Sequence, residues 1–199
     1  MPVKGSALSK RMQEPGDHVN FFSAELKTIL WAEKHLLKAL PKWKKPVAAT
    51  ELKTLLGKYS KSGHVKIKRL EQIFEHLHET ARAKKSEAMA GIIEEVNGSI
   101  LQAAGKGSSL KDMAVMVTIQ KLVQYQVAAY TGLVQLAHTM GNEEIIPLLE
   151  QTLAEEQETN DELTAFAGSA NGTPARDEQE EVPTAVYDSI NLTGKHNKT

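Results

Sequence analysis

The stretch "FFSAELKTILWAEKHLLKALPK", residues 21–42, carries a clear helical pattern. Its large apolar residues recur three and four positions apart, which places them on one side of a helix; they are Phe22, Leu26, Ile29, Leu30, Leu36, Leu37 and Leu40. We predict a helix that begins near Asp17, a good N-cap residue after a Pro-Gly pair, and runs to about Leu40. Pro41 and Pro46 are expected to end it.

Four further segments show the same periodicity. A second helix is predicted from Thr50 to about Leu77, with a kink or break at 61–64, where Gly63 weakens the helix. Others are predicted over about 86–104, 110–140 and 143–167. Only 5% of the residues are aromatic, and Ala, Leu, Glu, Lys and Gln dominate the middle of the chain, as is typical of helices. Four long helices and one short helix with short connections predict an all-α antiparallel four-helix bundle.

The ends of the chain differ from this bundle in composition. We expect residues 1–16 to be a flexible N-terminal segment and residues 17–167 to form the helical domain. From Gly168 onward Gly, Asn, Thr, Pro and charged residues predominate. The tail of residues 168–199 is therefore expected to be disordered or loosely docked.

Charge and composition exclude several classes of function. The 24 Lys and Arg nearly balance the 25 Asp and Glu, so a net charge of −1 gives no general attraction to nucleic acid or an anionic membrane. No apolar run approaches a membrane span or a secretory leader, and we expect a cytoplasmic protein. The lysine-rich stretches "KALPKWKK" and "KSGHVKIKR" are expected to be solvated. Because the chain has no cysteine, any metal site would use His and carboxylates.

Two carboxylates lie on apolar stripes. Glu33 is four residues after Ile29 and four before Leu37, and Glu156 is in line with Leu149 and Leu153. Both are therefore expected to point into the bundle. An ionised carboxylate in a dry core is too costly to keep alone, so each must be protonated, paired or bound to a cation.

Neutral polar residues follow the same stripes. Gln120 and Gln126 are in line on the predicted fourth helix, Asn160 is one turn after Glu156, and Tyr59 is on the stripe of the second helix. We expect Tyr59, Gln120, Gln126 and Asn160 to form an interior hydrogen-bonded network with the carboxylates.

Metal sites in bundles of the di-iron type use a Glu from each of two helices and a Glu-x-x-His from each of the other two. No Glu-x-x-His falls on an apolar stripe of this sequence. No nucleophile triad or phosphate-binding loop is present either, and we assign no catalytic residue.

Five blocks of the sequence resemble a known family. They are "FFSAELKTILWAEKHLLKALPK", "RLEQIF", "AMAGIIEE", "YQVAAYTGL" and "LLEQTLAEEQETNDELTAFA", and in this order they resemble the YciF-like proteins over about residues 21–167. This bacterial family belongs to the ferritin-like superfamily. The resemblance implies a ferritin-like four-helix bundle, a homodimer and an association with stress responses.

The resemblance also implies site residues. Glu33, Glu95 and Glu156 match glutamates of the family pattern and are the candidate metal ligands. Asn160 stands where relatives usually have Asp, and Gln124 and Gln126 stand where they have His and Glu. Most groups that would complete a dimetal site are thus replaced by neutral ones.

We favour a stress-associated structural or binding protein with a lost or degraded dimetal centre and no cofactor. The alternative is an oxidoreductase or metal-storage protein that binds iron or manganese through Glu33, Glu156 and Glu95. A third hypothesis is an interaction module, in which the bundle surface or the acidic "RDEQEE" of the tail binds a protein partner.

Overall fold

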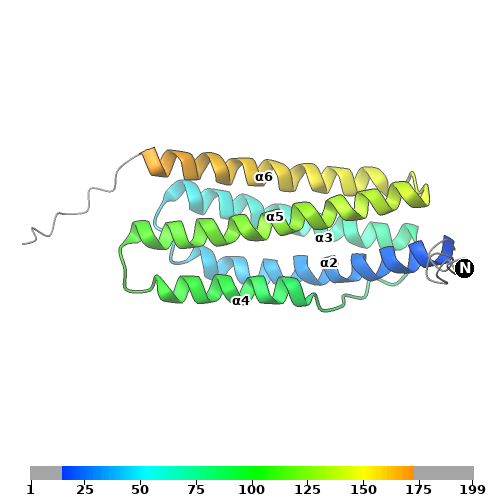
Figure 1. The fold of residues 1–199 in the computed structure, drawn as a ribbon, viewed down its shortest axis with the longest axis horizontal. Helices are drawn as coiled ribbons and strands as arrows, with labels where there is room; N and C mark the ends of the chain where they lie inside the picture. Colours follow the sequence, from blue (N-terminus) through cyan, green and yellow to red (C-terminus); the bar gives the residue numbers. More distant parts are fainter. Residues whose placement is uncertain (1–14, 173–199) are drawn as a thin grey trace, which may run out of the picture.

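A computed structural model describes residues 15–172, which form an all-α bundle. The elements in chain order are α2 (Pro15–Lys44), α3 (Thr50–His76), α4 (Glu87–Gln102), α5 (Ser108–Met140) and α6 (Ile146–Gly172). Figure 1 shows the four long helices α2, α3, α5 and α6 running along the long axis, with the short α4 beside α2 and α5. The predicted antiparallel four-helix bundle with one additional short helix is confirmed within this range.

Most of the two expected end segments lies outside the described residues. Of the expected N-terminal segment 1–16, residues 1–14 are not described. Of the expected tail 168–199, residues 168–172 are the last part of α6, and residues 173–199 lie outside the description. None of the described helices combines the length and the apolar character that crossing a membrane requires.

Helix α2 extends past the residue that was expected to stop it. Pro41 lies inside α2, which continues to Lys44. The added turn is held by packing, because Trp43 is only 1% exposed and its indole Nε1 donates to Asn97 Oδ1 of α4 at 2.8 Å. Tertiary packing thus outweighs the loss of one helical hydrogen bond at Pro41. Pro46 does follow the end of the helix, as expected.

The expected break near Gly63 does not occur. Helix α3 is unbroken from Thr50 to His76, and Gly63 is buried within it. A Cβ atom at this position would lie 2.7 Å from Leu37 Cδ2 of α2. The glycine therefore serves a close approach of α2 and α3 rather than an interruption of α3.

The connections between helices are fixed by specific polar contacts. Ser86 caps α4 by accepting a hydrogen bond from the Met89 backbone N–H at 3.2 Å. Asp112 of α5 accepts from the backbone N–H groups of Ala48 and Ala49 at 2.7 Å each, which ties the α2–α3 connection to α5. Gly141 ends α5 in the left-handed conformation at φ 65°, which glycine adopts readily.

The buried apolar residues form two groups along the bundle. One contains Leu36, Trp43, Tyr59, Val123 and Leu163 among others, and the other contains Leu30, Leu70, Tyr130, Ile145 and Leu149 among others. On each long helix a buried polar residue lies at or next to the boundary between the two groups: Glu33 on α2, Lys66 on α3, Gln126 on α5 and Glu156 on α6. The core thus contains a polar layer, to which every long helix contributes.

Candidate functional site

The polar layer is a cluster of charged and hydrogen-bonding side chains with no access to solvent. Glu33, Lys66, Gln126 and Glu156 are each 0% exposed. Tyr59 and Tyr130, 3% and 0% exposed, complete the cluster. Because charged groups are seldom fully buried unless they are paired, their contacts decide which charges this interior holds.

Glu156 is the ion-pair partner of Lys66. The Lys66 ammonium donates to Glu156 Oε1, and the Tyr59 hydroxyl donates to Glu156 Oε2 at 3.0 Å. The Lys66 Nζ also lies 4.3 Å from the centroid of the Tyr59 ring, within the range of a cation–π contact. Burial raises the pKa of the Glu156 carboxyl, and the Lys66 charge and these hydrogen bonds oppose that increase.

Glu33 has hydrogen-bond donors but, within residues 15–172, no ion-pair partner of its own. Its Oε1 accepts from Gln126 Nε2 at 2.9 Å and from the Tyr130 hydroxyl at 2.9 Å. Burial, opposed by the Lys66 charge and reinforced by the Glu156 charge, raises the pKa of Glu33 to about 7 from 4.5. Glu33 therefore carries a proton for much of the time near neutral pH.

The protonation of Glu33 suits both its hydrogen bonds and the charge balance. Glu33 Oε2 and Gln126 Oε1 are buried acceptors without a donor among the described residues. A proton on Oε2 turns one of these acceptors into a donor. It also leaves one ammonium and one carboxylate in the layer, so that the interior is neutral. Burial raises the pKa of Tyr59 and Tyr130 well above the ordinary value, so both hydroxyls stay protonated and donate.

A second ion pair borders the cluster between α3 and α6. Arg69 donates from Nη1 to Glu155 Oε2 at 2.8 Å and from Nη2 to Glu155 Oε1 at 2.5 Å. Its Nη1 also donates to Thr152 Oγ1 at 3.0 Å. Arg69 is 7% exposed, whereas the Glu155 side chain is 28% exposed. This bidentate pair extends the polar contact between the two helices from the interior towards the surface.

The structure brings only some of the predicted site residues together. Tyr59 and Gln126 bind the two carboxylates, as expected of an interior network. Glu33 and Glu156 are both buried, as their stripes predicted. Glu95 is on the surface of α4, where it pairs with Lys121 at 2.6 Å, and it does not join them.

The interior placement of Gln120 and Asn160 is wrong. Gln120 donates to Thr164 Oγ1 at 3.0 Å, and Asn160 accepts from Gln124 at 2.7 Å, both at the outer edge between α5 and α6. Gln126 is six positions after Gln120, and at about 100° per residue their side chains point about 120° apart. They therefore cannot share the interior face.

Sequence reasoning missed Lys66, the cation of the cluster. The stretch "KSGHVKIKR" was expected to be a solvated face, yet Lys66 and Arg69 within it are buried. The signal was present, because Lys66 is seven residues after Tyr59 and four before Leu70, on the apolar stripe of α3. A lysine has a long apolar stem and commonly lies at the edge of such a stripe, which made the surface interpretation the natural one.

The residues present do not fit a ferritin-type dimetal centre. Such a centre combines carboxylates from all four helices with imidazoles, whereas this layer offers two carboxylates, two phenols, an amide and an ammonium. The ammonium already bonds one of the two carboxylates, so a divalent ion at that carboxylate would lie beside a like charge. Within residues 15–172, no three His, Asp or Glu side chains lie together in an arrangement that could hold a metal ion.

Comparisons with known proteins agree with the predicted family. Residues 18–175 match the family described as "Domain of unknown function (DUF892)". Protein YciF of Escherichia coli K12 is 31% identical over 137 residues, which cover 68% of this chain and 81% of the relative.

Two solved structures share the fold. The E. coli stress protein YciF matches with a TM-score of 0.74 and 28% identity, covering 81% of this chain and 99% of that one. YcfI from Rhodopseudomonas palustris, for which a structural role has been suggested, matches with a TM-score of 0.71 and 26% identity. That match covers 76% of this chain and 94% of the relative.

The raised pKa of Glu33 predicts a pH-dependent stability. Between its ordinary pKa of 4.5 and about 7, the folded chain binds a proton that the unfolded chain has released. This proton uptake stabilises the folded chain fully below about pH 4.5, and the stabilisation is lost as the pH rises to about 7. The free energy of unfolding should fall by about 3 kcal/mol over this range. Urea unfolding at pH 5 to 8 should show this decline in the native chain and a much weaker one in Glu33→Gln. Equal declines in the two proteins would show that the pKa of Glu33 is not raised in the folded chain.

The Lys66–Glu156 pair predicts a non-additive pair of substitutions. Lys66→Met should lower the free energy of unfolding by about 3–5 kcal/mol, because it leaves a buried carboxylate without its cation. Adding Glu156→Met should restore most of that loss, since two apolar groups of similar size then face each other. Lys121→Met, which breaks the exposed pair with Glu95, should change stability little. A double variant no more stable than Lys66→Met would show that the two side chains are not coupled.

Proposed function

The chain belongs to the family described as "Domain of unknown function (DUF892)", and from this premise we propose that it is a YciF-like, stress-associated protein with a structural or binding role rather than a catalytic one. In this proposal the interior charge cluster replaces the dimetal centre of ferritin-like bundles. Its task is to hold the four helices in one arrangement. The protein acts through its folded surface and not through chemistry in its core.

The observation that carries the proposal is the position of the Lys66 ammonium. In a metal centre the metal ions neutralise the carboxylates that the helices place in the core. Here a side chain of the protein itself neutralises Glu156, and a proton neutralises Glu33. The cluster therefore has a neutral, hydrogen-bonded form that needs no metal ion.

The sealed environment of the cluster also supports a role without catalysis. The four central side chains are fully buried, so a substrate has no contact with them in this conformation. Two surface grooves, one between α4 and α5 and one between α2 and α4, are lined by other residues. A binding role for the outer surface is compatible with this arrangement, whereas turnover in the core would require the bundle to open.

The family relatives support the biological context of the proposal. The E. coli relative is a stress protein, and a structural role has been suggested for the relative from R. palustris. We extend a stress-associated role to this chain on the basis of family membership. The homodimer that the resemblance implies and the cytoplasmic location expected from the sequence are part of the same proposal.

Metal analysis tests the proposal directly. Protein purified after growth with added iron, manganese and zinc should hold far less than one metal ion per chain. A Glu33→Ala, Glu156→Ala variant should hold the same small amount. If the native chain retains about one or more ions per chain and the variant none, the metal-binding oxidoreductase or storage function would replace our proposal.

A further variant tests whether the charge of Lys66 keeps metal ions out of the cluster. Lys66→Gln keeps the length of most of the side chain but removes the charge, which frees Glu156 for another cation. We expect this variant to retain more divalent metal than the native chain under the same conditions. An unchanged metal content in Lys66→Gln would show that the ammonium is not the group that excludes metal.

A further inference from the structure

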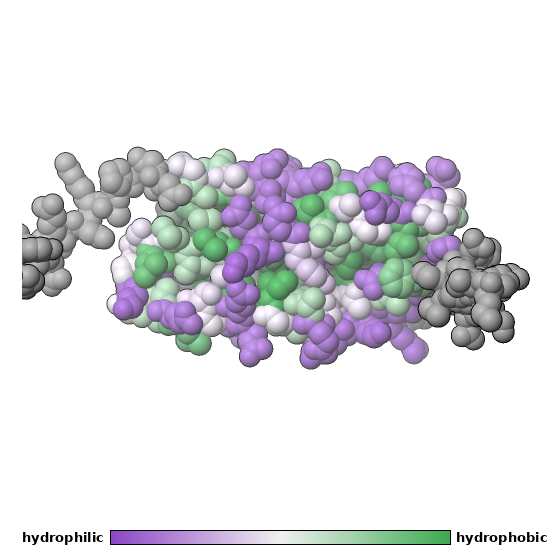
Figure 2. Space-filling model, in the orientation of Figure 1, coloured by the Kyte–Doolittle hydropathy of each residue, from purple (hydrophilic) through white to green (hydrophobic). Residues whose placement is uncertain are grey.

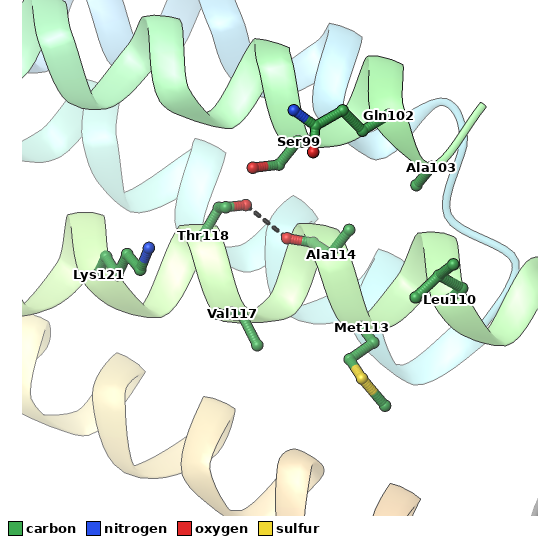
Figure 3. A pocket seen from close by; sticks show the side chains of 9 residues that line it. All are labelled: Ser99, Gln102, Ala103, Leu110, Met113, Ala114, Val117, Thr118 and Lys121. Atoms are coloured by element: carbon green, nitrogen blue, oxygen red, sulfur yellow. Dashed lines mark hydrogen bonds between the residues drawn. The ribbon is translucent and has the colours of Figure 1, made fainter.

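An apolar groove lies between the end of α4 and the beginning of α5. It is lined by Ser99 and Gln102 of α4, by Ala103 just after α4, and by residues of α5 between Leu110 and Lys121, and its volume is about 450 Å³. Figure 3 shows Leu110, Met113 and Val117 along α5 and Ser99 and Gln102 on α4, with the Met113 and Val117 side chains on the side of α5 that faces away from α4. Most of the groove surface comes from aliphatic side chains, so it suits an apolar occupant.

Apolar side chains gather at this groove more than elsewhere on the described surface. Leu110, Met113 and Val117 are 49%, 46% and 42% exposed, and Leu101, beside the groove on α4, is 73% exposed. These are four of the seven large apolar side chains that are exposed within residues 15–172. Figure 2 shows apolar surface over the end of the molecule where α4 and α5 are joined. Contiguous exposed apolar surface of this kind marks an interaction site.

The described part of the chain ends at the same end of the bundle as this groove. The hydrogen bonds from Gln120 to Thr164 and from Gln124 to Asn160 set the antiparallel alignment of α5 and α6. Continuing that alignment places Gly172, at the end of α6, level with Asp112 of α5. Figure 1 shows the same relation, because α6 ends at the end of the bundle where α4 connects to α5.

The sequence that follows carries apolar residues with no place in the described core. The family match ends at residue 175, so residues 176–199 are an addition to the shared fold. They begin with the acidic "RDEQEE" at 176–181. Residues 182–192 then contain the large apolar side chains Val182, Val186, Tyr187, Ile190 and Leu192. We propose that residues 182–192 of the same chain bind in the α4–α5 groove and cover its apolar surface.

Length and charge both favour this occupant. The ten residues from Gly172 to Val182 reach up to about 33–36 Å when extended, and the groove spans only about 17 Å along α5 from Leu110 to Lys121. The acidic 176–181 segment would pass Lys106 and Lys111, which are exposed and half-buried at the start of α5. Opposite charges therefore flank an apolar contact, an arrangement that fixes the direction in which the segment lies.

The covering of the groove would have a consequence for association. A free apolar groove invites a second copy of the chain, whereas an intramolecular cover acts at a high effective concentration and displaces weak intermolecular contacts.

Cross-linking tests the proposal, since the native chain has no cysteine to interfere. In dilute full-length protein, the Met113→Cys, Ile190→Cys double variant should form an intramolecular disulfide under mild oxidation. The Val65→Cys, Ile190→Cys control, with a cysteine at an exposed position of α3, should form far less. Substituting Val186, Tyr187 and Leu192 by Ser should abolish the first cross-link, whereas Ser189→Ala with Asn191→Ala should not.

Two results would overturn the proposal. The first is equal cross-linking of the Met113 and Val65 variants, which would show that the tail does not favour the groove. The second is cross-linking mainly between different chains when the Met113→Cys and Ile190→Cys single variants are mixed, which would make a second copy the occupant. Because Met113 is exposed and Ile190 lies outside the described bundle, both variants should retain native helicity, which circular dichroism checks.

Discussion

The ion pair between Lys66 and Glu156, together with the proton on Glu33, is the interaction on which this bundle depends. Two carboxylates and an ammonium are removed from water at the centre of a helical core, and each must find its partner there. A pair of this kind adds little net stability compared with apolar side chains, but breaking it is costly. Each of the four long helices contributes at least one member of the layer. The rotation and the axial position of every helix are therefore constrained by the same few contacts, while the apolar layers on either side supply most of the stability.

This arrangement relates the protein to its ferritin-like family and also sets it apart. In ferritin-like bundles, polar side chains from four helices point to the same part of the core, where a metal centre would neutralise the carboxylates. In this chain the positions hold a mixture that balances its own charge: one lysine, two glutamates, a glutamine and two tyrosines. The tyrosine hydroxyls and the Gln126 amide donate to the carboxylates, which leaves few lone pairs for an external cation. We therefore propose that the protein acts through its surface rather than its core, and the α4–α5 groove offers apolar contacts there.

Much of the fold followed from the sequence, and the differences have physical causes. The helical periodicity predicted all five helices and the inward direction of Glu33, Tyr59, Gln126 and Glu156. Pro41 and Gly63 were misjudged because both act locally as helix breakers, whereas here the packing of Trp43 and the close contact with Leu37 decide the outcome. Gln120 was misplaced by a rotation of about 120° around α5. Lys66 was missed because burying an ammonium makes sense only once its partner on α6 is known, and that partner is 90 residues away in the sequence.

The central claim is that the neutral form of the polar layer is the stable one, with Lys66 paired to Glu156 and Glu33 protonated near neutral pH. The most direct test is a pH titration of the intact protein followed by the carbon-13 chemical shift of the Glu33 side-chain carboxyl, identified by its absence in Glu33→Gln. The account predicts a titration midpoint near pH 7, because burial raises the pKa of Glu33 to about that value. A midpoint near the ordinary value of 4.5 would mean that Glu33 is ionised in the core at neutral pH, and it would contradict the account.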